Sequence, residues 1–490
     1  MFFKLKNMTI KREWKVILKK LFPNCFLKKI EQNELENVVT IIDDFTIAYY
    51  KLIHGENITG TQVCKKAKNR ILYYINNFAI NCNNYVILQD EKRHVPSNKS
   101  ITWEKRKNNN KVQPYSNEEI LLLKITDGVL PNPQRLIITS YLRDELYAYC
   151  NNGISSIFAE QKNLLQKNSF TLLIDTCRTK INDEIRLCQS KYSFNKEGKL
   201  SKNIYQANKI GESDLKMVYH LIETCKLYPE KNIIIRTIDS DSIPILLLNI
   251  RDIISQTDHM LHNNIYIDMR SRFENKNDFT KKSDSETNEE DNEEDNEEED
   301  DSNGYIINIT QLWIDIGKYF YSNFPYLSHP YEVMCFLIAI TKTDYSDNFK
   351  TIGPNKVWKS FIEKGFHYFY NKDLSYITIP ITMDNYGCPN SYRDIRAYEN
   401  KLWEFIKSCA PKNKNLQEIE KNNEFYSKIR RCIWVLNYWS NGGRDIPTKG
   451  SYLYPFPDPL LEQDDKSLYG WEIERTTKNV ILSKHVFIQK

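Results

Sequence analysis

The sequence lacks any apolar run long enough to cross a membrane. Its longest apolar stretches, IPILLLNI and VMCFLIAI, fall far short of the roughly 20 residues that a membrane-spanning helix needs. The 11 cysteines are scattered, without a CxxC pair and without histidine and cysteine at metal-ligand spacing. Together with the lack of a recognisable signal peptide, these absences predict a soluble, reduced intracellular protein with no structural zinc and no membrane partner.

An excess of one charge sign is also lacking, because 68 basic residues nearly balance 64 acidic ones and leave a net charge of +4. The balance is uneven along the chain. Much of the acid lies in residues 283–301, so the remainder of the chain is basic and suits a polyanionic partner. The surrounding residues 272–304 contain almost no apolar side chains, which predicts a disordered acidic insert. We expect a solvated tether; the alternatives are a docking segment for a basic partner and an autoinhibitory mimic of DNA.

The apolar pattern predicts an α/β fold. With 41% hydrophobic and 12% aromatic residues, the chain can bury a sizeable core. Continuous apolar runs of strand length alternate with stretches of helical spacing, which is typical of a central, mostly parallel sheet flanked by helices on both faces. The expected strands are residues 38–42, 85–88, 170–174, 232–238 and 264–269, and the expected helices include residues 10–21, 213–225, 331–341 and 355–365.

Acidic residues recur where these strands end or where helices begin. In a parallel sheet, ligands bind beyond the carboxyl ends of the strands, and a pocket of gathered carboxylates is costly unless hard cations fill it. In TIDSDS, residues i and i+2 of an extended backbone would point the same way, so that Asp239 and Asp241 would face one cation. For most of these acids the alternative is an ordinary helix cap. The candidate metal ligands are Asp43, Asp90, Glu212, Asp214, Asp239, Asp241 and Asp344.

Two basic segments accompany the acids. After Asp90, a helical spacing would place Lys99, Trp103, Arg106 and Lys107 on one face, where they could hold a terminal phosphate and an unpaired base. The alternative is a solvated charged helix. After Asp344, the segment DNFKTIGPNKVWK separates two helical patterns and could grip duplex phosphates through backbone N–H groups. Its candidate DNA-binding residues are Lys350, Gly353, Pro354 and Lys356.

In this order, the motifs resemble the flap endonuclease family of structure-specific 5′ nucleases, with features of the 5′–3′ exoribonucleases. The resemblance is discontinuous, from about Met8 to Phe366, and rests on IIDDFTIAYYKL, YVILQD, GESD, TIDSD and TKTDYSDNFKTIGPNKV. It implies a PIN-like core with a helical arch and a helix–two-turn–helix element. It also implies two Mg²⁺ ions, or Mn²⁺, held by the seven acids, and a monomeric enzyme that cleaves branched or 5′-ended DNA in replication, repair or recombination. Such a substrate would place the protein in the nucleus or at a viral replication site.

The sequence departs from the family in several places. Thr9 stands where the family has a glycine, Asp214 stands for a glutamate, and no sliding-clamp-binding box is recognisable. Asp127, in ITDGVLP, is a rival to Asp90 as the second acid. Two other functions stay open: an exoribonuclease acting on 5′-monophosphate RNA, and a DNA-junction binding protein with little or no catalysis.

The same motifs divide the chain into four parts. Residues 1–271 would form the nuclease core, including a basic arch region at residues 91–150. The acidic insert of residues 272–304 would follow. Residues 305–379 would form the duplex-binding helix–two-turn–helix part, and residues 380–490 a helical, aromatic C-terminal cap of unassigned role.

Overall fold

The computed structural model describes a little under half of the chain. The described residues are 12–44, 58–59, 82–88, 124–125, 171–181, 184–194, 200–206, 210, 212–237, 239–256, 263–270, 305–325, 327, 329–341, 349, 352–363, 365–369, 392–410, 412, 414–421 and 425–440. Within them, no helix is both long enough and apolar enough to cross a membrane.

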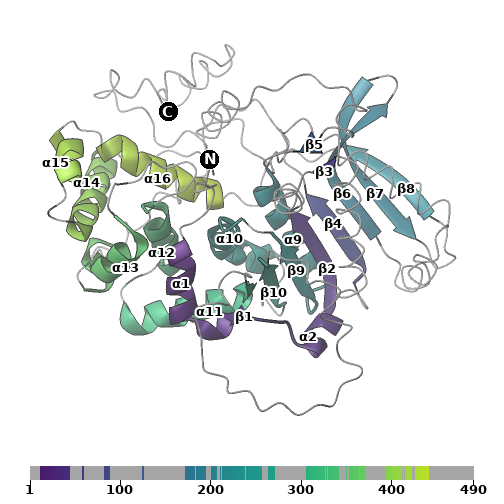
Figure 1. The fold of residues 1–490 in the computed structure, drawn as a ribbon, viewed down its shortest axis with the longest axis horizontal. Coiled ribbons are helices and arrows are strands. Elements are labelled where there is room, and N and C mark those ends of the chain that lie inside the picture. The colour runs from purple at the N-terminus through teal and green to yellow at the C-terminus, as the bar shows by residue number, and fades with distance from the viewer. Residues whose placement is uncertain are drawn as a thin grey trace.

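A nine-stranded mixed sheet organises the described residues, in the order β1-β11-β10-β9-β2-β4-β6-β7-β8 (Figure 1). Its five middle strands, which are β10, β9, β2, β4 and β6, run parallel to one another. They are flanked by antiparallel strands on each side: β11 and β1 at one edge, and the β7–β8 meander at the other. The strand bounds are β1 Phe26–Leu27, β2 Val38–Asp44, β4 Asn84–Leu88, β6 Thr171–Ile181, β7 Glu184–Phe194, β8 Leu200–Gln206, β9 Asn232–Arg236, β10 Ile265–Asp268 and β11 Ile306–Asn308. This arrangement confirms the predicted α/β class and its mostly parallel sheet. A separate two-stranded sheet pairs β3 Ile58–Thr59 with β5 Lys124–Ile125.

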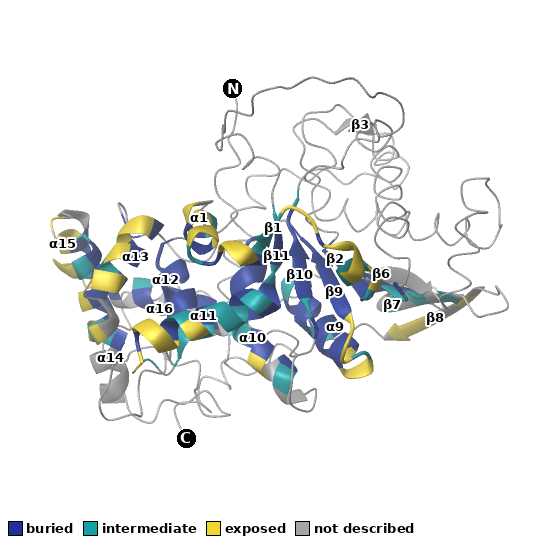
Figure 2. Cartoon of the chain, turned by 90° about the horizontal axis from the view of Figure 1, so that it is seen from below, coloured by how far each residue is buried: buried dark blue, intermediate teal, exposed yellow. Residues whose placement is uncertain are grey.

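The described helices gather on one side of the sheet and beyond its β1 edge. Helices α9 and α10 pack together, and Figure 2 shows them on the same face of the sheet, with α11, α12 and α16 continuing the helical layer. Helix α13 lies between α1 and α14. The helix bounds are α1 Arg12–Leu21, α2 Gln32–Glu36, α9 Ser213–Leu227, α10 Ser242–Gln256, α11 Ile309–Asn323, α12 Pro330–Ala339, α13 Pro354–Glu363, α14 Tyr392–Cys409, α15 Lys414–Lys421 and α16 Phe425–Ser440. A second helical layer on the opposite face stays a prediction.

The central strands are apolar on both faces, which explains their continuous β-branched runs. Ile42 and Ile235 lie side by side in the sheet and belong to the same apolar core as Leu215 of α9 and Leu246 of α10. Residues one position earlier in each strand point to the other face, and these are buried as well, as Ile41 shows. In β2, β9 and β10 the charged side chains lie only at the carboxyl ends of the strands, and these ends position the candidate site.

Candidate acidic site at the carboxyl edge of the sheet

Strand β2 ends in two buried carboxylates. Asp43 is 0% exposed and accepts a hydrogen bond of 2.7 Å from the Tyr85 hydroxyl of β4. Asp44 is 4% exposed and accepts one of 3.2 Å from the Thr237 hydroxyl, just past the end of β9. Because successive side chains of a strand point to opposite faces, β2 delivers one carboxylate to each face of the sheet. Asp43 thus lies at the strand end, as the sequence predicted, and Asp44 is buried just beside it.

The segment that holds Asp239 and Asp241 forms a turn and not an extended strand. The Asp239 carboxylate accepts a hydrogen bond of 3.0 Å from the backbone N–H of Asp241. The backbone N–H of Asp239 donates one of 3.1 Å to the Thr237 hydroxyl. The carbonyl of Asp241 then accepts the first helical hydrogen bond of α10, from Ile245 at 3.1 Å. The expectation of extended backbone at this segment was therefore wrong, while the expectation that both acids face one cation stays a prediction. Asp239 performs the local helix-starting role that the sequence offered as the alternative.

Helix α9 begins with the other predicted pair. Glu212 is its N-cap residue, is 6% exposed, and makes no side-chain capping hydrogen bond. Asp214 lies in the first turn, half-buried, and accepts a hydrogen bond of 3.1 Å from the Tyr438 hydroxyl of α16. Burial of a glutamate at a helix start without a capping bond is not explained by capping alone. This distinguishes Glu212 from Asp239.

Sequence reasoning missed a buried ionic cluster between β6 and α9. Asp175 of β6 is paired in register with Leu88 of β4, and Leu88 is paired in register with Asp44 of β2. Its carboxylate lies 2.7 Å from His220 Nε2 and 3.9 Å from Lys216 Nζ, and all three side chains are buried. Burial alone would raise the pKa of Asp175, but the His220 hydrogen bond and the Lys216 charge together lower it to about 2. A signal was present, because Asp175 directly follows the apolar run FTLLI, just as Asp43 follows VVTII.

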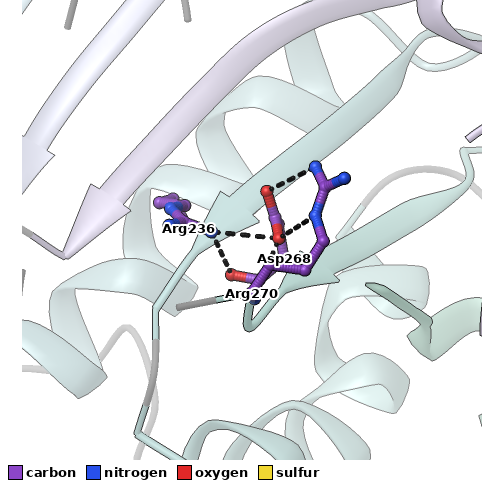
Figure 3. A network of polar contacts seen from close by, with 3 residues as sticks. All are labelled: Arg236, Asp268 and Arg270. Carbon is purple, nitrogen blue, oxygen red and sulfur yellow. Dashed lines mark hydrogen bonds and ion pairs between the residues drawn. The ribbon is translucent and has the colours of Figure 1, made fainter. Parts of the chain in front are cut away.

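A second missed network places two guanidinium groups at the same edge of the sheet. Arg236, the last residue of β9, is level with Asp43 on one side and Asp268 of β10 on the other. Figure 3 shows Asp268 between Arg236 and Arg270, with Arg236 Nη1 and Arg270 Nε each 3.0 Å from its Oδ1 atom. Burial would raise the pKa of Asp268, but the two arginines outweigh burial and lower it to about 2. Cations as well as acids therefore occupy the carboxyl edge.

Three consecutive residues of α1 lie near three segments that carry predicted site residues. Lys15 lies close enough to Asp239 for the two charges to interact; burial lowers the pKa of Lys15, and the charge of Asp239 opposes this. Trp14 Nε1 donates to the Thr341 hydroxyl at 2.8 Å, just after α12. A Cβ atom at Gly353, immediately before α13, would lie 3.4 Å from Glu13 Oε2. Helix α1 therefore links the Asp239 turn to the start of α13.

In the segment that the sequence predicts to bind duplex DNA, the described residues 352–363 lead directly into a helix, as expected. Gly353 precedes α13, Pro354 is its first residue, and Lys356 is exposed in its first turn. Pro at the first helical position matches the preference of that site, whose N–H needs no partner. Lys350 lies outside the described residues, as do the predicted acids Asp90 and Asp344, the rival Asp127, and the basic set Lys99, Trp103, Arg106 and Lys107.

The described residues do not by themselves complete a metal site. Carboxylates are the ligands that Mg²⁺ and Mn²⁺ prefer, so the chemistry of the donor set fits such an ion. Within the described ranges, however, no group of three or more His, Cys, Asp or Glu side chains could hold a metal ion. The structure thus brings carboxylates to one edge of the sheet without gathering three of the described ones around a common point.

Sequence comparison does not assign the chain to a family. No protein-family model matches the chain, and no curated protein is similar to it in sequence. The resemblance to flap endonucleases therefore depends on the motifs alone.

Proposed function

We propose that the chain is a divalent-metal-dependent 5′ nuclease that hydrolyses phosphodiester bonds in branched or 5′-ended DNA during replication, repair or recombination. The observation that supports this best is the position of the carboxylates. Two adjacent parallel strands, β2 and β9, end at or just before acidic residues, and α9, which packs on β2 and β4, begins with two more. The carboxyl ends of parallel strands are where α/β proteins bind their ligands.

In this proposal the metal ligands are the seven acids that the motifs single out, five of which are described. Two Mg²⁺ ions, or Mn²⁺, would lower the pKa of an attacking water and neutralise charge on the leaving oxygen. The chain's own residues would hold the substrate and the ligands in position. The Tyr85 hydroxyl fixes the Asp43 carboxylate, and the turn that follows β9 fixes Asp239. Lys15, beside Asp239, would add a positive charge for a scissile phosphate.

The remaining motifs would bind the nucleic acid on either side of this edge. Backbone N–H groups near Gly353, together with Lys350 and Lys356, would contact duplex phosphates without sequence preference. The basic set that follows Asp90 would receive the 5′ end. The proposed function also implies a PIN-like architecture, a helical arch and a helix–two-turn–helix element. The α/β sheet is the part of this architecture that the structure shows.

A DNA-junction binding protein without cleavage activity is the second candidate. It is favoured by the engagement of the Asp239 carboxylate in a turn. A guanidinium level with Asp43 would also neutralise part of the charge that a metal ion otherwise balances.

A cleavage assay with a labelled 5′-flap DNA in Mg²⁺ distinguishes these functions. We expect the wild type to release the flap, and Asp239→Asn to cut at least ~100-fold more slowly, a loss of about 2.7 kcal/mol of transition-state stabilisation. Asp315→Asn is the matched control, because this carboxylate lies on α11 beside Cys25, and we expect it to retain full activity. Equal rates for wild type and Asp239→Asn would contradict the proposed site.

The same assay separates the alternatives. Tight flap binding without cleavage in either Mg²⁺ or Mn²⁺ would support the junction-binding protein. Faster degradation of a 5′-monophosphate RNA than of the DNA flap would support an exoribonuclease.

A further inference from the structure

The last turn of α16 contacts the start of α9, although the two segments are 224 positions apart in the sequence. The Tyr438 hydroxyl donates a hydrogen bond of 3.1 Å to Asp214 Oδ2. Tyr438 is 1% exposed, and Asp214 is half-buried. A C-terminal helix, which lies beyond the motifs of the nuclease resemblance, therefore reaches one of the proposed metal ligands.

Packing holds this tyrosine in place independently of its hydroxyl group. The next residue, Trp439, is buried, and its carbonyl accepts a hydrogen bond of 2.6 Å from the Asn249 side chain of α10. Helix α16 also packs along α10 and α12. The ring of Tyr438 is thus positioned by its surroundings, and its hydroxyl is available to orient a neighbour.

Asp214 needs such support more than a longer acid would. It lies in the first turn of α9 and stands for a glutamate in the motif, so its carboxylate is shorter by one methylene. A hydrogen bond from a rigid donor restricts the rotation of the carboxylate and thereby presents its oxygen atoms in one orientation. Outer groups that orient metal ligands in this way typically contribute 10–100-fold to metal affinity.

We propose that Tyr438 is a positioning residue for Asp214, through which the C-terminal helical segment contributes to the metal site. This inference rests on the proposed function, because it assumes that Asp214 binds the metal ion. It assigns a role to α16 that the sequence left open. Removal of the hydroxyl should weaken metal binding without disturbing the fold.

The test is Mn²⁺ binding to the full chain, measured from the electron paramagnetic resonance signal of free Mn²⁺, with cleavage of the flap DNA as a second readout. We expect Tyr438→Phe to weaken Mn²⁺ binding about tenfold. The matched control is Tyr266→Phe. Tyr266 is also buried and donates a hydrogen bond of the same 3.1 Å length to a carboxylate, Glu34, at the amino edge of the sheet. We expect this control to bind Mn²⁺ like the wild type.

A double-mutant cycle separates positioning from a structural role. If Tyr438 acts through Asp214, Tyr438→Phe should have no further effect on Mn²⁺ affinity in an Asp214→Asn background. Wild-type affinity in Tyr438→Phe, alongside weakened binding in Asp214→Asn, would overturn the inference and leave the proposed metal site intact. Failure of the wild type both to bind Mn²⁺ and to cleave DNA would overturn the proposed function, and this inference with it.

Discussion

Replacement of Asp175 by asparagine would show how much the buried charges between β6 and α9 stabilise the fold. In the folded protein the pKa of Asp175 is about 2, against an ordinary value of 3.8. That difference corresponds to roughly 2 kcal/mol of stability at neutral pH. The amide also removes the negative charge that Lys216 and His220 face, and loss of one member of a buried pair costs about 3–5 kcal/mol. We therefore expect Asp175→Asn to reduce the free energy of unfolding at pH 7 by about 2–5 kcal/mol.

The effect should depend on pH in a defined direction. Because the pKa is lower in the folded state, the Asp175 carboxylate contributes its full stability above about pH 4 and loses it as the pH falls towards 2. The wild type and the variant should therefore converge in acid. Asp268, whose pKa is also about 2, remains in both proteins and should give both curves a shared acid slope.

Urea denaturation followed by tryptophan fluorescence, at pH 7 and in steps down to about pH 2.5, measures this difference. Asp315→Asn is the control, because among the described residues Asp315 pairs with no arginine or lysine and contacts Cys25 and Gln311 instead. The reasoning would be refuted if Asp175→Asn unfolded at the same urea concentration as the wild type at pH 7. It would equally be refuted if the difference between the two proteins persisted unchanged into the acid range.

Two further changes test the contacts around α1, α11 and α13. Gly317→Ala should destabilise the protein by about 1–3 kcal/mol, because the new Cβ would lie 2.7 Å from the Tyr331 hydroxyl oxygen. A Gly317→Ala/Tyr331→Phe double variant should recover most of that loss in thermal denaturation, since the nearest remaining ring atom is 3.6 Å away. Glu13→Gln should tighten duplex DNA binding a few-fold in a fluorescence-anisotropy titration, because it removes a negative charge beside the N-terminus of α13. Glu363→Gln, the same change at the other end of α13, should have a smaller effect, and equal effects would contradict a phosphate contact at the N-terminus.

The strands could be predicted from sequence because their signal is local. The runs that contain Ile42 and Ile235 are continuous and β-branched, as expected for parallel strands buried on both faces, and the structure confirms them. The same local logic placed Asp43 at a strand end and Glu212 at a helix start. Applied to FTLLI, it would also have found Asp175, which was overlooked.

Other features of the site depend on information that no local pattern carries. The extended-backbone prediction for Asp239 and Asp241 was wrong because Ser240 and Asp241 form a turn, stabilised by the carboxylate that was expected to face a cation. Tyr438 lies in an amphipathic helix with ordinary core spacing, so only the folded structure reveals its contact with Asp214. The cations Arg236 and Lys15 were likewise recognisable as charges, but their positions among the acids follow from strand order and helix packing.

The place of β2 in the sheet has a consequence for the order in which the protein assembles during synthesis. Strand β2 can pair with β4 as soon as both are made, but its other neighbour is β9, and the hydrogen bond from Thr237 to Asp44 spans 193 positions. Until β9 leaves the ribosome, one backbone edge of a strongly β-branched strand has no such partner, and unpaired strand edges of this kind recruit other chains. The completed sheet therefore depends on late-made residues to protect early-made ones, and a chain that ended before Asn232 would keep that edge of β2 open to aggregation.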